Sequence, residues 1–187
     1  PDIRADGFSN TAYNLSVDLK HIEGYSRLAG IVVGKMNVRQ FVRRFSKKQG
    51  FTDDIMRDLV AKMGQWFFRG PLEEHEVAAF RGISTTVASA GGTFEEALAL
   101  LVEAMLQSPR FIYRVENERG DGTAWPVNEY ELASRISYII WGAPPDAQLL
   151  KAAENGQLFE DDGLEVQLKW MLDDPRAARR SAEFIHE

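Results

Sequence analysis

Helical periodicity constrains the fold of this chain more than any other feature of its sequence. In segment after segment, apolar residues recur every three or four positions. Two segments open with capping boxes, Thr93 with Glu96 and Asn128 with Glu131. No strand–helix–strand alternation is visible. The pattern predicts an all-α fold, a multi-helix orthogonal bundle of about eight helices with at most one short strand pair.

Residues 110–116 fit two structures. Their apolar and polar side chains alternate as in a short strand, but Pro109 also suits the first turn of a helix. Both interpretations stay open. Residues 38–48 are expected to form a short basic helix, which is typical of a solvated face and also of a contact with an acidic partner or a lipid surface.

Composition excludes several functional classes. The 187 residues include 22 Lys or Arg and 28 Asp or Glu, a net charge of −6 that argues against a general nucleic-acid binder. No apolar run approaches the roughly 20 residues of a transmembrane helix. Cysteine is absent. The chain therefore has no disulfide, thiolate metal site, cysteine nucleophile or covalent haem attachment of its own.

We expect the chain to be a piece of a longer protein. It begins without an initiator Met or a signal peptide, and residues 184–187 continue a helical pattern. We predict three regions: an N-terminal arm with helices at 1–50, a helical module at 51–107, and the first part of another module at 108–187. Residues 117–126 are polar and glycine-containing, so they are expected to form a loop.

The histidines give no complete metal site. His75 has Pro71 and Ala79 at the positions where a helical partner ligand would stand. His186 and Glu187 would open a His-Glu-x-x-His zinc motif only if a second His followed beyond the chain. We therefore predict no metal site within these residues.

The candidate functional residues form a polar–aromatic cluster in the sequence. Its members are Arg110, Tyr113, Arg114, Glu116, Arg135 and Trp141. One interpretation is architectural, with Arg110 or Arg114 paired to a carboxylate, because an unpaired buried charge is costly. The other is an anion or substrate clamp. Asp146 is predicted to cap the helix that follows it.

Several separated motifs resemble known modules of unknown function. Residues 66–76 resemble the signature of the planctomycete domain of unknown function 1595, with Gly70 where that family carries a second Arg. Four segments resemble its neighbour, domain 1592: residues 106–116, 130–138, 141–146 and 171–177. Residues 7–10 carry a weaker resemblance to the end of a third module, 1587.

The resemblance implies a setting rather than an activity. Similar modules occur in exported bacterial proteins associated with c-type cytochromes, so it implies a periplasmic or cell-envelope location. Any c-type haem would lie on another module or a partner. The implied partners are further C-terminal modules, a second chain of the same protein, or a cytochrome c.

Two functional hypotheses follow from the polar–aromatic cluster and the resemblance together. The first is a helical scaffold and interaction module in a periplasmic electron-transfer or polymer-processing system. The alternative is part of an oxidoreductase or hydrolase active site, acting on an envelope or extracellular substrate and completed by C-terminal modules. Whether the chain is an enzyme stays open.

Overall fold

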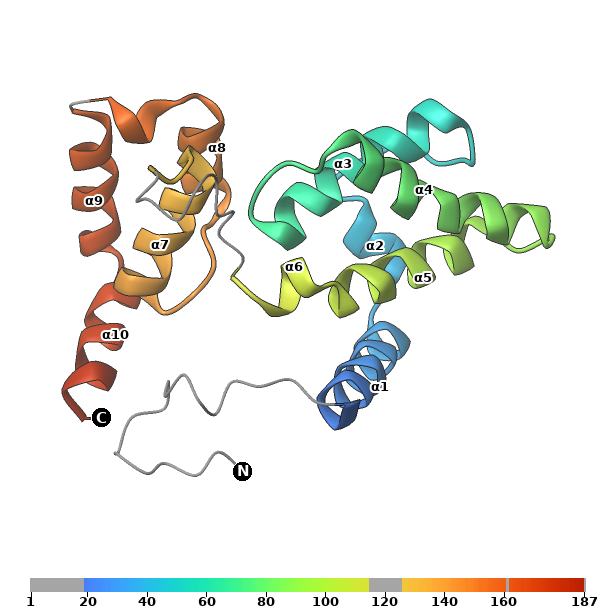
Figure 1. Cartoon of the computed structure of the whole chain (residues 1–187), viewed down its shortest axis with the longest axis horizontal. Coiled ribbons are helices and arrows are strands. Elements are labelled where there is room, and N and C mark those ends of the chain that lie inside the picture. The colour runs from blue at the N-terminus through green and yellow to red at the C-terminus, as the bar shows by residue number, and fades with distance from the viewer. Residues whose placement is uncertain (1–18, 115–125, 161, 187) are drawn as a thin grey trace, which may run out of the picture. The chain divides into compact units, whose positions relative to one another are not determined.

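The computed structural model describes residues 19–114, 126–160 and 162–186, and every regular element among them is helical (Figure 1). This part of the chain contains ten α-helices, of which eight have seven residues or more. The predicted all-α fold with about eight helices is therefore confirmed. No helix in the described ranges is both long and apolar enough to cross a membrane.

The described residues divide into two compact units, which we call the N-terminal unit (residues 19–114) and the C-terminal unit (residues 126–186). Each unit has its own cluster of buried apolar side chains. Each is therefore described by itself. The predicted division at residues 50 and 107 stays a prediction.

The N-terminal unit is built around one central helix. Its six helices are α1 (Leu19–Lys35), α2 (Val38–Val42), α3 (Asp53–Phe68), α4 (Glu74–Ser89), α5 (Phe94–Gln107) and α6 (Pro109–Ile112). Helix α5 packs against each of the other five. Leu98, Leu101 and Met105 of α5 are fully buried, so this helix supplies the centre of the core.

Local capping explains several helix starts. The Thr93 hydroxyl accepts from the Glu96 N–H (3.2 Å) and Glu96 accepts from the Thr93 N–H (2.7 Å), which confirms the predicted box. Helix α4 begins with Glu76 accepting from the Glu73 N–H at 2.8 Å. Thr52 occupies the position before α3 with extended backbone, but its side chain makes no capping hydrogen bond.

Local hydrogen bonds define two short helices of the N-terminal unit. Pro109 begins the one-turn helix α6, where the Ser108 hydroxyl accepts from the Arg110 N–H, so the helical interpretation is correct for residues 109–112. Residues 115 and 116 of this segment lie outside the described ranges. Helix α2 ends at Val42 and is shorter than the predicted 38–48. Beyond it the Lys48 N–H bonds the Ser46 hydroxyl at 3.2 Å, a local turn that competes with a helix.

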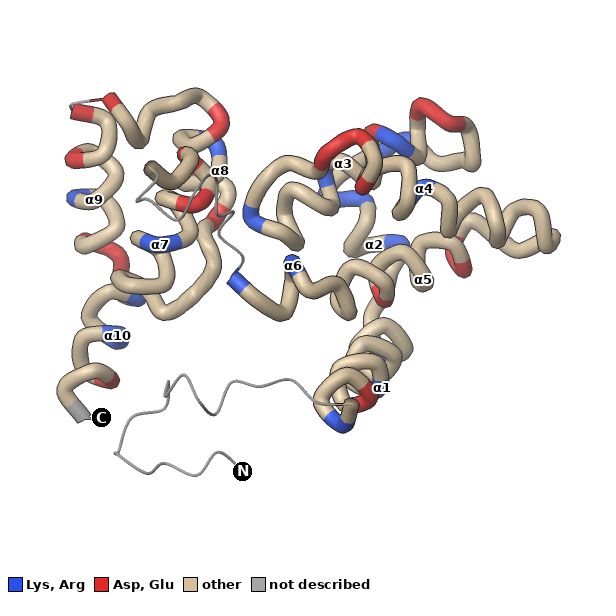
Figure 2. The backbone as a smooth tube through the Cα atoms, in the orientation of Figure 1, with Lys and Arg blue, Asp and Glu red and all other residues tan. Residues whose placement is uncertain are grey.

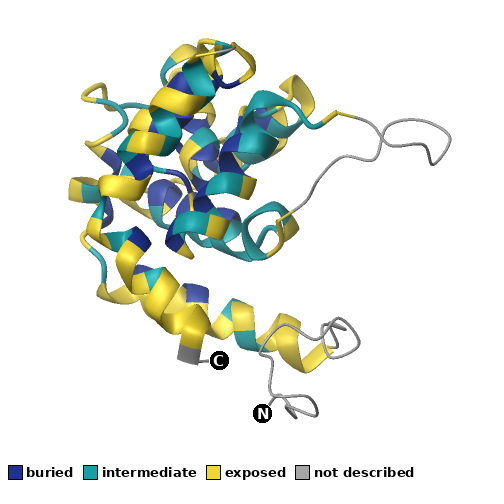
Figure 3. Ribbon diagram, turned by 90° about the vertical axis from the view of Figure 1, so that its left-hand side faces the viewer, coloured by how far each residue is buried: buried dark blue, intermediate teal, exposed yellow. Residues whose placement is uncertain are grey.

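The C-terminal unit is a smaller helical bundle. Its elements are α7 (Glu129–Trp141), α8 (Ala147–Glu154), a 3₁₀ helix (Gln157–Phe159), α9 (Gly163–Asp173) and α10 (Pro175–His186). The Glu129 carboxylate joins α7 to the 3₁₀ helix by accepting from the Leu158 N–H at 3.0 Å. Figure 3 shows that α10, which leads to the C-terminus, is largely exposed over its last turns.

Candidate functional site

Arg69 holds the short helix α6 in place. It ends α3 in a left-handed conformation (φ 60°), which side-chain-bearing residues rarely adopt, and it is only 8% exposed. Its guanidinium donates hydrogen bonds to the carbonyls of Arg110 (2.6 Å) and Tyr113 (2.7 Å). A third bond reaches the Phe111 carbonyl at 3.3 Å. The strained backbone thus aims a cation at three carbonyls of one turn.

Arg110 of the predicted cluster pairs with a carboxylate. Its guanidinium bonds Glu76 of α4, donates to the Pro71 carbonyl (3.2 Å), and lies 5.3 Å from the centroid of the Phe68 ring. Partial burial pushes the pKa of Glu76 upward. The Arg110 hydrogen bond, the Glu73 N–H and the Arg110 charge outweigh it, so the pKa is lowered. The pair therefore stays ionised and joins α4 to α6.

The rest of the cluster in the N-terminal unit is more exposed. Tyr113 is 39% exposed and offers its carbonyl, not its hydroxyl, to Arg69. Arg114 is exposed and takes part in an interaction with another residue. Glu116 lies outside the described residues.

Trp141 lies in the core of the C-terminal unit. It is 5% exposed, and its indole N–H donates to the Met171 carbonyl at 3.0 Å. The Trp170 ring meets it edge-on at 5.2 Å. The last cluster residue, Arg135, lies on α7 and has an interaction partner of its own. Trp141 and Arg135 thus belong to the C-terminal unit, whereas Arg110, Tyr113 and Arg114 belong to the N-terminal unit.

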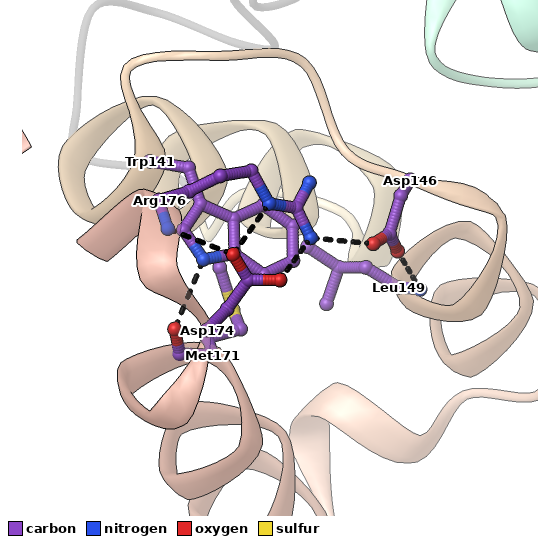
Figure 4. A network of polar contacts seen from close by, with 6 residues as sticks. All are labelled: Trp141, Asp146, Leu149, Met171, Asp174 and Arg176. Carbon is purple, nitrogen blue, oxygen red and sulfur yellow. Dashed lines mark hydrogen bonds and ion pairs between the residues drawn. The ribbon is translucent and has the colours of Figure 1, made fainter. Parts of the chain in front are cut away.

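Arg176 organises a polar network around Trp141 (Figure 4). Its guanidinium carbon lies 3.5 Å from the centroid of the Trp141 ring. The guanidinium also donates to Asp174 (2.8 Å and 2.9 Å) and to Asp146 (3.0 Å). We call these four residues, Trp141, Asp146, Asp174 and Arg176, the Arg176 network. It joins the C-terminal ends of α7 and α9 to the starts of α8 and α10.

Both carboxylates of the network also cap helices. The Asp146 carboxylate accepts from the Leu149 N–H at 3.1 Å, which places it at the N-cap of α8. Asp174 accepts from the Arg176 N–H at 2.8 Å, at the start of α10. The side-chain and backbone hydrogen bonds from Arg176 lower the pKa of Asp174 from 3.8 to about 2. Asp174 and Arg176 are therefore both charged at neutral pH.

Sequence reasoning missed Arg69, Glu76, Asp174 and Arg176 as site residues. Asp174 and Arg176 are only two residues apart, but the other partners lie far away in the chain. Arg69 is about forty residues from its acceptors, Glu76 is 34 from Arg110, and Arg176 is thirty from Asp146. One usable signal was the position of Arg69 inside the 66–76 motif. The other was the Asp174–Pro175 pair, because Asp followed by Pro is typical of the start of a helix.

The chemistry available at these sites is charge pairing and backbone recognition. No group of three or more His, Asp or Glu residues suited to a metal ion occurs within residues 19–114, 126–160 and 162–186. His75 faces Glu73, with its Nδ1 3.3 Å from the carboxylate. His186 ends α10, and Glu187 lies outside the described residues.

Comparison with known proteins places the two modules on the chain. Residues 55–116 match the family model described as Protein of unknown function (DUF1595), and residues 127–187 match that of Protein of unknown function (DUF1592). A search of curated proteins and a search of solved structures each returned no match. The first match covers most of α3 through α6, and the second covers the C-terminal unit from α7 onward. Two stretches of the chain therefore match models of unknown function, DUF1595 followed by DUF1592, in the order that the motifs predict.

Proposed function

We propose that this chain is a helical scaffold and interaction module of a larger exported protein, and not itself a catalytic centre. The observation that carries the proposal is that three arginines of the matched motifs bind groups of the protein itself. Arg69 binds three backbone carbonyls, Arg110 binds Glu76, and Arg176 binds two carboxylates over a buried ring. A substrate clamp needs cations directed at a ligand, whereas these cations are directed at the protein.

Unfolding measurements separate the scaffold from the enzyme alternative. Catalytic groups are commonly held at a cost in stability, so their replacement leaves the free energy of unfolding unchanged or raises it. If the arginines are architectural, Arg69→Ala and Arg176→Ala each lower the urea midpoint of their own unit. Arg44→Ala and Arg179→Ala, at exposed positions of the same two units, are the matched controls. Unchanged or raised midpoints for both arginine variants would favour the active-site alternative.

Helix α10 is the part of the C-terminal unit best suited to bind further polypeptide. Phe184 is 69% exposed and Ile185 is 78% exposed, both on its last turns. We propose that further modules of the same protein or a second copy cover them. Hydrogen exchange tests this: the α10 amides should be better protected in the native protein purified from its source than in the 187-residue chain. Equal protection would contradict the proposal.

The cellular setting is a separate proposal that rests on the family resemblance. It places the protein in the periplasm or cell envelope, in a redox or polymer-processing system associated with a c-type cytochrome. The visible absorption spectrum of the native complex, purified at low ionic strength, tests the association. Haem bands in a fixed ratio to this chain support it. A colourless complex, or recovery of the protein in the cytoplasmic fraction, overturns it.

A further inference from the structure

Residues 19–50 carry a charge opposite to that of the rest of the chain. They contain eight Lys or Arg and one acidic residue, Glu23. The remaining 155 residues contain 14 Lys or Arg and 27 Asp or Glu. Figure 2 marks the cationic positions of α1 and α2 in blue. The positive charge of this segment attracts an anionic surface. The net negative charge of the remaining residues repels the same surface.

Helix α1 also exposes much of its apolar surface. Ala29 and Val33 are buried in the unit, and α1 packs against α5. Six larger apolar side chains of the helix are exposed: Leu19, Ile22, Tyr25, Leu28, Ile31 and Val32. Their exposed fractions run from 37% for Tyr25 to 69% for Leu19. So many exposed apolar side chains on one 17-residue helix mark a binding surface.

The helical repeat orders α1 into three adjacent stripes. Residues three, four or seven positions apart share a side of a helix. In order around the helix, the stripes are Ala29 with Val33, then Tyr25 with Leu28 and Val32, then the cations Lys20 and Arg27 together with Ile31. The exposed apolar stripe thus lies between the buried stripe and a cationic one. This is the arrangement of a helix that lies in the plane of a membrane interface.

The segment after α2 adds cations beside an exposed indole. Four side chains there are exposed cations: Arg43, Arg44, Lys47 and Lys48. The Trp66 ring, on a residue 44% exposed, meets Phe41 edge-on at 5.7 Å and Phe45 at 5.9 Å. Tryptophan favours the lipid–water boundary because its ring is apolar and its N–H is polar. Arg39 of α2 is already 3.7 Å from Glu95, so the four later cations are the more accessible ones.

We propose that α1, α2 and residues 43–48 bind the surface of an anionic lipid bilayer. The apolar stripe of α1 enters the headgroup boundary, and the neighbouring Lys and Arg side chains contact lipid phosphates. No described helix can span a bilayer, so the attachment is to the surface. Apolar burial and charge act together here, which a stable peripheral attachment requires. This site is separate from the arginine contacts of the proposed scaffold.

Vesicle sedimentation tests the proposal with the purified 187-residue chain. Vesicles of phosphatidylglycerol and phosphatidylcholine in equal parts should bind the chain at least about tenfold more tightly than phosphatidylcholine alone. The binding should weaken as salt is added, because ions screen the cations. Equal binding to both vesicles, or no binding to either, overturns the proposal.

Two variants separate the charge from the apolar contribution. The cation variant R43Q/R44Q/K47Q/K48Q should lose at least about tenfold in affinity for the anionic vesicles. The apolar variant L28S/V32S should lose affinity as well, while circular dichroism shows that the fold is retained. The matched control, K62Q/K151Q/K169Q/R179Q, removes the same charge from exposed positions elsewhere. A control that loses as much as the cation variant contradicts a local site.

Light scattering distinguishes a lipid surface from a second copy of the chain. A self-association interface predicts a dimer whose mass falls to that of a monomer in L28S/V32S, without anionic vesicle binding. That result would overturn the lipid proposal. A monomer that binds anionic vesicles, and whose L28S/V32S variant is a monomer that does not, supports it.

Discussion

The guanidinium carbon of Arg176 lies 3.5 Å from the centroid of the Trp141 ring. The same guanidinium bridges Asp174 and Asp146, so one side chain combines a cation–π contact with two ion pairs. A planar guanidinium can make all of these contacts at once, and the compact ammonium of lysine cannot. The identity of this cation therefore matters as well as its charge.

We predict that Arg176→Lys destabilises the C-terminal unit by about 1–2 kcal/mol, even though the charge is kept. Urea unfolding followed by tryptophan fluorescence measures the loss, since Trp141 and Trp170 lie in this unit. Arg179→Lys, at an exposed position of the same helix, is the control. Equal midpoints for the two variants would show that the stacked geometry contributes nothing.

Acid should weaken the Arg176 network. The pKa of Asp174 is lowered from 3.8 to about 2 by its hydrogen bonds with Arg176, so its stabilising contribution is complete above pH 4. That contribution is lost as the pH falls from about 4 to about 2, because the unfolded chain takes up the proton first. Melting temperatures at pH 7 and pH 3 measure this. In Asp174→Asn the fall should be smaller than in the wild type and in Asp173→Asn.

Arg69 should be replaceable by glycine at a lower cost than by alanine. Both changes remove the three hydrogen bonds to α6, a loss of about 1–3 kcal/mol. Alanine must in addition hold the left-handed conformation, which costs about 1 kcal/mol more than glycine. Urea midpoints should therefore rank wild type, Arg69→Gly and Arg69→Ala in descending order. A glycine variant less stable than the alanine variant would contradict the backbone argument.

Asp146 should show two separable contributions. Asp146→Ala loses the cap of α8 and the bond to Arg176, and the cap alone is worth about 1 kcal/mol. Asp146→Asn keeps an acceptor for the Leu149 N–H but removes the ion pair, which is partly exposed and worth less. The alanine variant should therefore melt at the lower temperature. Identical melting temperatures would mean that Asp146 does not act as a cap.

Gly163 should not tolerate a side chain. A Cβ at this position would lie 1.9 Å from the Gln157 carbonyl oxygen, so the 3₁₀ helix and the start of α9 would have to move apart. Gly163→Ala is expected to destabilise the C-terminal unit by about 1–3 kcal/mol. Gly82→Ala is the matched test in the interior of α4, where nothing lies within 4 Å. It should stabilise by up to about 1 kcal/mol, as measured by thermal unfolding.

Features of the fold that depend on neighbours in the sequence were predictable. The boxes at Thr93–Glu96 and Asn128–Glu131 use residues three positions apart, so the pattern that suggests them also contains every atom they need. Helix α2 was predicted too long, because two local signals in its sequence favour different structures. Its amphipathic pattern continues to Lys48, but the local turn at Ser46 wins over the helix.

The candidate site was predictable only in part. The pairing of Arg110 with some carboxylate follows from the cost of an isolated buried charge, but the choice of Glu76 depends on how α4 packs. No signal in the sequence indicated Arg176, because two of its partners lie far from it in the chain. The ring that it covers belongs to Trp141, and one of the carboxylates that it binds belongs to Asp146. The membership of Arg110 and Trp141 in different units could not be read from the motifs, since both residues lie in aromatic stretches of similar character.

Helix α6 has four residues, too few to persist on its own in water. Its carbonyls are bound by Arg69, which is synthesised about forty residues earlier. While the protein is being made, α3 therefore leaves the ribosome with a cation whose acceptors do not yet exist. Arg69 can make these hydrogen bonds only after the stretch through Tyr113 has emerged.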